Sequence, residues 1–320
     1  MRYNILGNTG IKVSELCFGV LPMGPLQADV PVDEGAEVLA EAMRSGVTYY
    51  DTAEMYRTYP YLKKAIDATG KKYDIVIGSK STAESYADMQ KAVEDALRAL
   101  DRDYIDIFLL HAARVPGDPR TVRAGAWECL QDMKDKGYIR ACGVSTHVVP
   151  TASLLAEGGT DILFPIYNNA GIGVIQGTMS EMREAVEKAA AKGIGCLSMK
   201  LLGGGNLLHD YLNAIAFGRE VDAFAAHAIG MVRMSELQLN LRVFNDEEIS
   251  RREVRDLKST KEMMFFRALC KRCGQCATRC PNFAIKMING QPEFDRSKCL
   301  LCGYCADACP EFAIRVRSIT

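Results

Sequence analysis

A duplicated cysteine pattern in the last fifth of the chain constrains its fold more than any other feature. Eight of the twelve cysteines among 320 residues form two repeats of Cys-x2-Cys-x2-Cys-x3-Cys-Pro, with 18 residues between the last cysteine of the first repeat and the first cysteine of the second. A chain of this length can bury a large core without covalent crosslinks, and disulfides are needed mainly by small secreted domains. The four cysteines outside the repeats lie singly and are expected to be buried: Cys17, Cys129, Cys142 and Cys196. We therefore interpret the repeats as a metal-binding module joined to a larger domain.

The spacing within the repeats predicts two iron–sulfur clusters. Three cysteines at intervals of three residues can hold three corners of a [4Fe-4S] cube, while the fourth ligand comes from the other repeat. One cluster would be bound by Cys270, Cys273, Cys276 and Cys309, and the other by Cys299, Cys302, Cys305 and Cys280. A structural zinc site is the alternative, because Cys-x2-Cys pairs also form zinc ribbons. Two complete repeats, each followed by proline, favour iron–sulfur.

Residues 265–320 resemble a bacterial two-cluster ferredoxin. We predict a small α+β ferredoxin-like domain at 267–320 and a charged helical connector at 246–266. The domain carries nine basic and four acidic residues, a charge of +5, whereas the remaining 266 residues carry 30 basic and 36 acidic residues, a charge of −6. A basic module could dock on the acidic part of the chain or on an acidic electron carrier. The excess could equally offset the charge of the clusters.

Residues 1–245 alternate short apolar runs with amphipathic stretches, which is the pattern of an α/β domain. Eight strands alternating with helices over this length predict a (β/α)8 TIM barrel, preceded by an N-terminal β-hairpin at 3–6 and 12–14. The alternative, an open doubly wound sheet, lacks the glycine-rich fingerprint after the first strand. The expected barrel strands are 15–19, 48–51, 74–80, 104–111, 139–145, 161–167, 195–199 and 221–230.

Four polar residues close or follow the second, third and fourth predicted strands: Asp51, Tyr56, Lys80 and His111. In a TIM barrel such strand ends meet at one face, where chemistry takes place. Reduction of a carbonyl requires a proton at oxygen, and tyrosine donates it well when a neighbouring cation lowers its pKa. We expect Lys80 to be that cation, Asp51 to orient it, and His111 to bind the substrate oxygen or relay the proton.

The segments that carry these residues resemble the aldo-keto reductases. The resemblance rests on Asp51-Thr-Ala-Glu-Met-Tyr56, Gly78-Ser-Lys80, the run 95–111 that ends in His111, and Gly143-Val-Ser145. It implies NAD(P)H-dependent reduction of an aldehyde or ketone, or the reverse oxidation of an alcohol, with Tyr56 as general acid. Within that family, the chain is similar to the subgroup with a C-terminal ferredoxin-like domain.

The cofactor half of the chain matches the family less closely. The family holds the nicotinamide carboxamide with a Ser-Asn pair and a Gln, and stacks an aromatic residue on the ring. This chain keeps the Ser as Ser145 but has Thr146 in place of the Asn. The Gln and the aromatic residue are also absent from their expected positions, near which the chain has Phe164 and Met199. Arg233 is a candidate for a 2′-phosphate, and the triple glycine 203–205 for a pyrophosphate. The predicted cofactor-binding residues are Ser145, Thr146, Asn168, Met199, Gly204, Arg233 and Asn240.

Arg114 and His147 lie just beyond the fourth and fifth strands, where they could bind an acidic substrate group. The net charge of −1 gives no overall attraction to nucleic acid or anionic lipid. We find no signal-peptide pattern at the N-terminus and no apolar run long enough to span a membrane, so we expect a cytoplasmic protein. The expected partners are a small carbonyl or alcohol substrate and a ferredoxin, flavodoxin or other redox protein.

The two halves handle electrons differently. Hydride transfer moves two electrons together, whereas each [4Fe-4S] cluster passes one, so coupling requires a one-electron-capable group such as a flavin. Three hypotheses follow from this difference. The chain is a nicotinamide-dependent carbonyl reductase with an electron-transfer module, a barrel without nicotinamide that receives electrons through the clusters, or a redox-sensing or adaptor protein.

Overall fold

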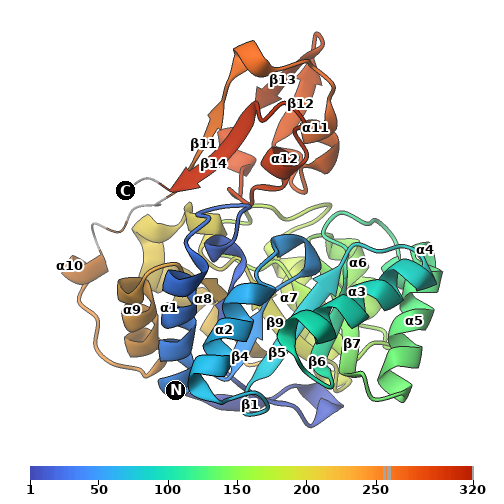
Figure 1. Cartoon of the computed structure of the whole chain (residues 1–320), viewed down its shortest axis with the longest axis vertical. Coiled ribbons are helices and arrows are strands. Elements are labelled where there is room, and N and C mark those ends of the chain that lie inside the picture. Colours follow the sequence, from blue (N-terminus) through green and yellow to red (C-terminus); the bar gives the residue numbers. More distant parts are fainter. Residues whose placement is uncertain (255–256, 258–260, 319–320) are drawn as a thin grey trace.

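The computed structural model describes residues 1–254, 257 and 261–318, and its larger part is a closed barrel of eight parallel strands (Figure 1). The strands follow one another in chain order, and the last closes the barrel against the first. The predicted (β/α)8 barrel is therefore confirmed. Its strands are β3 (Leu16–Gly19), β4 (Tyr49–Asp51), β5 (Val76–Ser81), β6 (Ile105–His111), β7 (Ile139–Thr146), β8 (Ile162–Pro165), β9 (Gly195–Met199) and β10 (Phe224–Gly230).

Amphipathic helices cover the outside of the barrel, and α3 (Tyr86–Leu100) illustrates why they form. Ser85 caps its N-terminus by accepting a hydrogen bond from the Asp88 N–H at 3.2 Å. Met89, Val93 and Leu100 lie on the face that is buried against the barrel. The other barrel helices are α1 (Val32–Arg44), α2 (Tyr59–Thr69), α4 (Pro119–Val122), α5 (Ala124–Asp135), α6 (Val149–Leu155), α7 (Met179–Ala191), α8 (Tyr211–Arg219) and α9 (Met234–Phe244).

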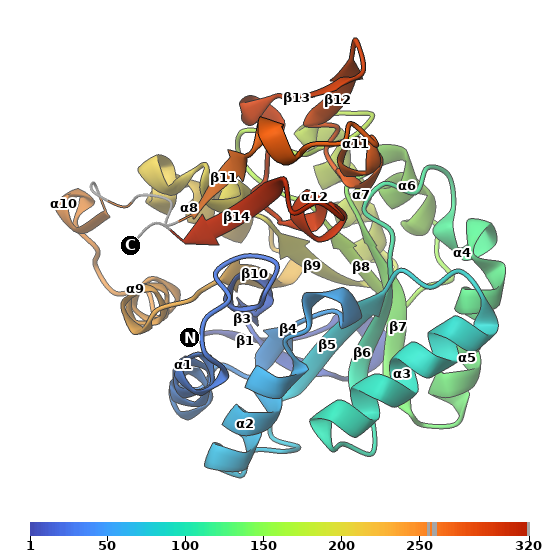
Figure 2. The same ribbon diagram turned by 45° about the horizontal axis from the view of Figure 1, so that its top comes forward.

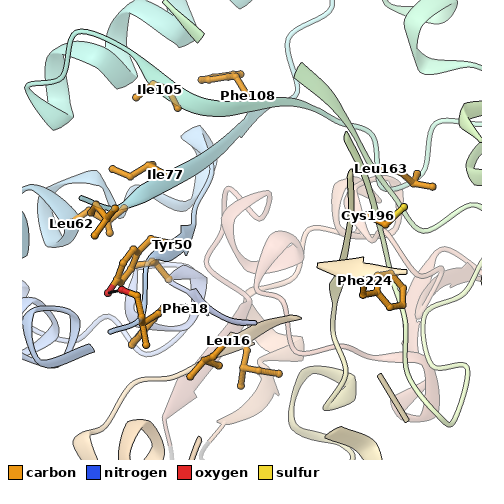
Figure 3. Packing of buried hydrophobic residues seen from close by; sticks show 14 of the residues in the cluster. Leu16, Phe18, Tyr50, Leu62, Ile77, Ile105, Phe108, Leu163, Cys196 and Phe224 are labelled. Atoms are coloured by element: carbon orange, nitrogen blue, oxygen red, sulfur yellow. Dashed lines mark hydrogen bonds between the residues drawn. The ribbon is translucent and has the colours of Figure 1, made fainter. Parts of the chain in front are cut away.

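Hydrophobic side chains form two layers, one inside the barrel and one between the strands and the helices. The hairpin of β1 (Tyr3–Ile5) and β2 (Lys12–Ser14) contributes Leu6 and Ile11 to the inner layer. In the outer layer, the rings of Phe18 and Tyr50 stack with centroids 6.1 Å apart (Figure 3). No helix in the described part of the chain combines the length and hydrophobicity needed to span a bilayer.

The C-terminal module is a small α+β unit whose first strand corrects one prediction. Residues 261–265 form β11 (Lys261–Phe265), which pairs antiparallel with β14 (Ile314–Ser318). The predicted helical connector at 246–266 is therefore wrong over these residues, because Met263 and Phe265 alternate toward the core of the module. The only helix described within the connector is the short α10 (Arg251–Val254), and residues 255–256 and 258–260 lie outside the described part of the chain.

The rest of the module consists of short elements around the cysteine loops. They are α11 (Gln275–Arg279), β12 (Ile285–Ile288), β13 (Gln291–Phe294) and α12 (Tyr304–Asp307). The module lies over the barrel face on which the loops after the strands gather (Figures 1 and 2). Glycines allow a very close approach here, because a Cβ on Gly303 would lie 1.9 Å from the Leu26 carbonyl oxygen, and one on Gly204 2.1 Å from that of Leu300.

A buried histidine makes the stability of the barrel dependent on pH. His227 on β10 is 1% exposed, and its Nδ1 lies 2.7 Å from the Ser198 hydroxyl. Burial, with a smaller contribution from the Arg219 charge, lowers the pKa of His227 from 6.5 to about 3. The unfolded chain therefore takes up this proton first as the pH falls. The contribution of neutral His227 to the free energy of unfolding is therefore complete above pH 6.5 and is lost as the pH falls from 6.5 toward 3.

We expect His227 alone to lower the free energy of unfolding by about 2 kcal/mol between pH 7 and pH 5. Urea unfolding at both pH values measures this difference. His227→Gln should remove this part of the pH dependence, whereas the same change at the exposed His209 should leave it intact. An unchanged pH dependence in His227→Gln would contradict the assignment.

Candidate active site

The four residues predicted to form a catalytic tetrad come together at the loop end of the barrel. Asp51 is the last residue of β4, Lys80 lies near the end of β5, and His111 is the last residue of β6. These three strands are neighbours in the barrel. Tyr56 ends the short 3-10 helix Glu54–Tyr56 that follows β4. The strand order therefore brings residues from three parts of the chain to one point.

A buried ion pair lies at the base of this group. The Lys80 ammonium donates to Asp51 Oδ1 at 2.5 Å and to the Thr52 carbonyl oxygen at 2.7 Å, and Lys80 is 1% exposed. Burial raises the pKa of Asp51, and the nearby Lys80 charge opposes this shift. The ammonium also lies 5.2 Å from the centre of the Tyr56 ring and 5.4 Å from that of Phe164. The pair holds a cation below the tyrosine in a fixed position.

Tyr56 and His111 face each other above the ion pair. Their rings meet edge to face, with centroids 5.7 Å apart. Burial and the neighbouring Tyr304 raise the pKa of Tyr56, so the expected lowering of this pKa by Lys80 is not found. Lys80 instead directs its hydrogen bonds to Asp51 and Thr52. Burial, followed by the Lys80 charge, lowers the pKa of His111 well below its usual value, which keeps the imidazole neutral at pH 7.

A cavity of about 480 Å³ opens beside the tetrad and reaches the start of α9. Asp51 and Tyr56 line one end, and Ser235 and Glu236 line the part formed by α9. A cavity of this size falls in the range of small-molecule and cofactor sites. Three of the predicted cofactor residues line it: Met199, Gly204 and Asn240.

The other predicted cofactor residues do not line this cavity. The Asn168 amide donates to the Ile172 carbonyl oxygen and accepts from the Ile172 N–H, both at 2.9 Å, so its polar atoms are used within its own loop. The Thr146 hydroxyl accepts from the Val148 N–H at 3.1 Å. Ser145 is fully buried, with its hydroxyl 3.4 Å from the Leu110 carbonyl oxygen, and Arg233 is exposed outside the lining.

Glu236 is a cavity residue that sequence reasoning missed. Its carboxylate accepts hydrogen bonds from the Val232 N–H at 2.6 Å and the Arg233 N–H at 3.2 Å. It thereby caps the N-terminus of α9, where an anion would otherwise bind. Asn240 also lines the cavity, but its amide is held by the Tyr211 hydroxyl at 2.9 Å and the Glu236 carbonyl oxygen at 2.8 Å. Glu236 lies in the first turn of α9, in a stretch that loosely matches the phosphate-binding end of the family pattern, but the sequence assigned it no role.

The eight module cysteines surround two small cavities. We call the set nearer the barrel the inner quartet and the other set the outer quartet. The inner cavity is lined by Cys280, Cys299, Cys302 and Cys305. The outer cavity is lined by Cys270, Cys273, Cys276 and Cys309. Each cavity thus combines three cysteines of one repeat with the fourth of the other.

Contacts from the barrel loops hold the inner quartet over the tetrad. The Arg114 guanidinium donates to the carbonyl oxygens of Thr278 and Cys280, both at 2.7 Å, and stacks on Phe283 at 3.9 Å from the ring centre. His147 Nδ1 lies 3.0 Å from Asn282 Oδ1. The expectation that Arg114 and His147 face a substrate pocket is therefore wrong, because both bind the module.

Tyr304 is the most unexpected residue at the site. It lies between the inner-quartet residues Cys302 and Cys305, and its hydroxyl is 3.1 Å from His111 Nε2 and 3.4 Å from the Tyr56 hydroxyl. More than 190 residues separate it from either partner along the chain. No sequence pattern indicates this contact, because a Gly-Tyr pair in a cysteine loop has no periodicity or spacing that points to the barrel.

Comparison with known proteins agrees with this geometry. A model described as "Aldo/keto reductase family" matches residues 15–223, and a model described as "4Fe-4S dicluster domain" matches residues 263–310. This chain belongs to the aldo/keto reductase family. The predicted combination of an aldo-keto reductase barrel with a C-terminal two-cluster domain is confirmed.

The individual relatives of this aldo/keto reductase cover only part of it. L-galactose dehydrogenase of Arabidopsis thaliana is 28% identical over 150 residues, which are 44% of this chain and 47% of the relative. Aldo-keto reductase YhdN of Bacillus subtilis (strain 168) is 27% identical over 159 residues, which are 45% of this chain and 47% of the relative. The chain thus spans about half the length of the curated relatives it matches.

Solved aldo-keto reductase structures share the barrel. Aldo-keto reductase AKR11C1 from Bacillus halodurans in its holo form superposes with a TM-score of 0.63 at 19% identity, covering 81% of this chain and 97% of that one. The aldo/keto reductase from Brucella melitensis has a TM-score of 0.59 at 20% identity, covering 80% of this chain and 99% of that one. At these identities the similarity shows the fold alone.

Proposed function

We propose that this aldo/keto reductase transfers hydride between NAD(P)H and a small aldehyde or ketone, or in reverse from an alcohol, accompanied by electron transfer through two [4Fe-4S] clusters. One observation carries the proposal. Tyr56 and His111 stand over the buried Asp51–Lys80 pair at the edge of a cavity of about 480 Å³.

The residues of the tetrad have distinct roles in this reaction. The carbonyl carbon accepts a hydride, which carries both electrons, and the carbonyl oxygen accepts a proton from the Tyr56 hydroxyl. The raised pKa of Tyr56 keeps this proton in place at pH 7. The Lys80 ammonium lies 5.2 Å from the centre of the ring on which negative charge would develop during the transfer. Neutral His111 can donate a hydrogen bond to the substrate oxygen. Asp51 holds Lys80 in position.

The two quartets suit iron–sulfur clusters better than zinc. In the described part of the chain, no three His, Cys, Asp or Glu side chains lie where they could hold a single metal ion. The four cysteines of each quartet instead line one small cavity, three from one repeat and the fourth from the other, as the two-cluster pattern requires. We propose that the quartets bind one [4Fe-4S] cluster each, and a bound cluster would accept or donate one electron at a time.

The inner quartet shares a wall with the large cavity. Gln27 lines the cavity, and its amide lies 3.5 Å from the Cys302 carbonyl oxygen. Gly204 lines the same cavity and packs against the Leu300 backbone. Lys200 also lines it, and the Cys302 thiol is close enough to affect the pKa of Lys200, which burial lowers. This proximity supports electron exchange between a cluster held by the inner quartet and a one-electron-capable group in the cavity, such as a flavin, but not between that cluster and nicotinamide.

The outer quartet is suited to a partner protein. Cys273 is exposed, as are the neighbouring Lys271 and Arg272. Basic side chains around an exposed electron-transfer site favour docking of an acidic carrier, such as a ferredoxin or flavodoxin. We propose that electrons enter or leave the chain at this point.

A second candidate function is a barrel without nicotinamide that receives single electrons through the clusters. The positions of the residues expected to hold the nicotinamide carboxamide favour this second function. Ser145, Thr146 and Asn168 do not line the cavity, and the polar atoms of Thr146 and Asn168 have partners elsewhere. A flavin or another one-electron-capable ligand would then occupy the cavity.

The role of Tyr56 as proton donor can be tested by substitution. Tyr56→Phe should lower kcat/KM for aldehyde reduction by about 10²- to 10⁴-fold, because the proton donor is lost. Steady-state assays with a small aromatic aldehyde and NADH measure this loss. Tyr86→Phe is the matched control, since the Tyr86 hydroxyl binds Asp132 rather than the tetrad. Normal turnover in Tyr56→Phe would refute the proposed acid.

Glu236 also bears on the choice of nucleotide. A carboxylate can accept a hydrogen bond from the 2′-hydroxyl of an NAD ribose, but it repels the 2′-phosphate of NADP. Glu236 lines the cavity and occupies the backbone N–H groups at the start of α9 that a phosphate would use. The exposed Arg233 does not line the cavity. We propose that the site prefers NADH to NADPH.

Glu236→Gln tests this preference while keeping an oxygen that can cap α9. The ratio of kcat/KM for NADPH to that for NADH should rise about tenfold or more, which corresponds to about 1.4 kcal/mol. Glu181→Gln is the control, because Glu181 accepts from the Thr178 N–H at the start of α7 and does not line the cavity. A wild-type preference for NADPH would contradict the proposal.

Nucleotide binding separates the two candidate functions. Protein prepared without oxygen should contain about eight iron and eight sulfide per chain. NADH titration, followed by nucleotide fluorescence, should show binding, while the visible absorbance of the clusters should persist because nicotinamide donates hydride. If NADH alone bleached the cluster absorbance, a one-electron-capable group would have to lie between the nicotinamide and the clusters. Absence of binding would favour the second candidate.

A further inference from the structure

The module contributes a side chain to the barrel's active site. The Tyr304 hydroxyl lies 3.1 Å from His111 Nε2 and 3.4 Å from the Tyr56 hydroxyl. The rings of Tyr304 and His111 meet edge to face with centroids 6.0 Å apart. Three aromatic side chains, two from the barrel and one from the module, therefore converge on one hydroxyl group.

That hydroxyl occupies a chemically defined position. In the proposed reaction, a carbonyl oxygen must lie within hydrogen-bond distance of both the Tyr56 hydroxyl and His111 Nε2. Tyr304 places a C–O–H group there, with the same two neighbours that an alcohol product would have. Two oxygen atoms cannot share this position, since even a hydrogen-bonded pair stays about 2.5–3.0 Å apart. Tyr304 and a substrate oxygen therefore exclude each other.

Tyr304 is held in this position at both ends of α12. Before it, Gly303 packs so closely on the Leu26 carbonyl that no side chain could fit between them. At the other end of the helix, Asp307 pairs with Arg57 at 3.1 Å, and Arg57 directly follows Tyr56. These contacts hold the backbone of α12 against the barrel, so displacement of the Tyr304 hydroxyl requires its side chain to rotate or the whole helix to shift.

We propose that Tyr304 is a specificity-determining residue of the active site, whose hydroxyl fills the carbonyl-oxygen position and must be displaced by substrate. The inference rests on the proposed carbonyl reduction. If the position is open in only a fraction of molecules, the apparent substrate affinity falls by that fraction while kcat is unchanged. Compounds that bind the cavity through other groups can displace Tyr304, whereas small aldehydes with few other contacts are disfavoured.

Ligand binding can test, without enzyme turnover, whether the Tyr304 hydroxyl fills an oxygen-binding position. Tyr304→Ala should create a site that binds phenol at least about tenfold more tightly than toluene, because the phenol hydroxyl restores the bond to His111. Calorimetry on the full-length, cluster-loaded protein measures both ligands. Wild type and Phe312→Ala should bind neither, since Phe312 is 71% exposed on the same module. In Tyr304→Ala, a further His111→Leu change should abolish the preference for phenol.

Kinetics test the displacement. For a small aldehyde, Tyr304→Ala should lower KM about tenfold or more with little change in kcat, and phenol should inhibit this variant competitively. Tyr304→Phe keeps the ring near the cysteine loop and should lower KM less. Iron and sulfide content must match wild type in each variant, so that loss of the cluster is not mistaken for opening of the site.

The outcomes separate this inference from the proposed function. A Tyr304→Ala or Tyr304→Phe variant with normal iron content and reduced kcat would overturn the inference, because Tyr304 would then assist the reaction. Equal binding of phenol and toluene would also overturn it. If phenol binds as expected but no variant reduces any carbonyl, the proposed reaction fails, while the assignment of an oxygen-binding position filled by Tyr304 stands.

Discussion

A buried ion pair between Asp51 and Lys80 is the interaction around which the candidate active site is arranged. Removing two charges from water costs several kcal/mol each, and their mutual attraction offsets this only when the geometry is good and the remaining hydrogen bonds are satisfied. Both conditions hold here, because Lys80 also donates to the Thr52 carbonyl oxygen. The pair requires β4 and β5 to be neighbours in the barrel wall. The same strand order then brings Tyr56 and His111 to the place where the cation can act on them.

The second constraint is the close approach of the two domains. The module is attached to the barrel by more than its connector. Gly303 of the module packs on the Leu26 carbonyl of the barrel, and Gly204 of the barrel packs on the Leu300 carbonyl of the module. Arg114, His147 and Arg57 add polar contacts around this interface. As a result, the inner quartet lies beside the large cavity and Tyr304 reaches the tetrad. The proposed electron transfer through the inner quartet and the proposed role of Tyr304 in substrate access therefore depend on the same interface.

Sequence reasoning succeeded where local spacing carries the information. The strands of the barrel, the hairpin, and the placement of Asp51, Lys80 and His111 at three successive strand ends all follow from hydrophobic periodicity and from polar residues that close apolar runs. It failed over residues 261–265, because the many charged residues before them favoured a helical connector. These residues form a strand whose alternate side chains pack into the core of the module. It also misassigned Arg114 and His147, because a loop residue can face either a pocket or a neighbouring domain.

The sequence by itself determined the two-domain composition, the barrel, the ends of its strands and the pairing pattern expected of the eight module cysteines. Each of these features follows from the periodicity or spacing of residues along a continuous stretch of the chain. Only the tertiary structure decided that Asn168 turns into its own loop, that Glu236 caps α9 at the cavity wall, and that Tyr304 meets His111 across 193 positions of the chain. These contacts depend on how loops and domains pack in three dimensions, and no local pattern of residues specifies that packing.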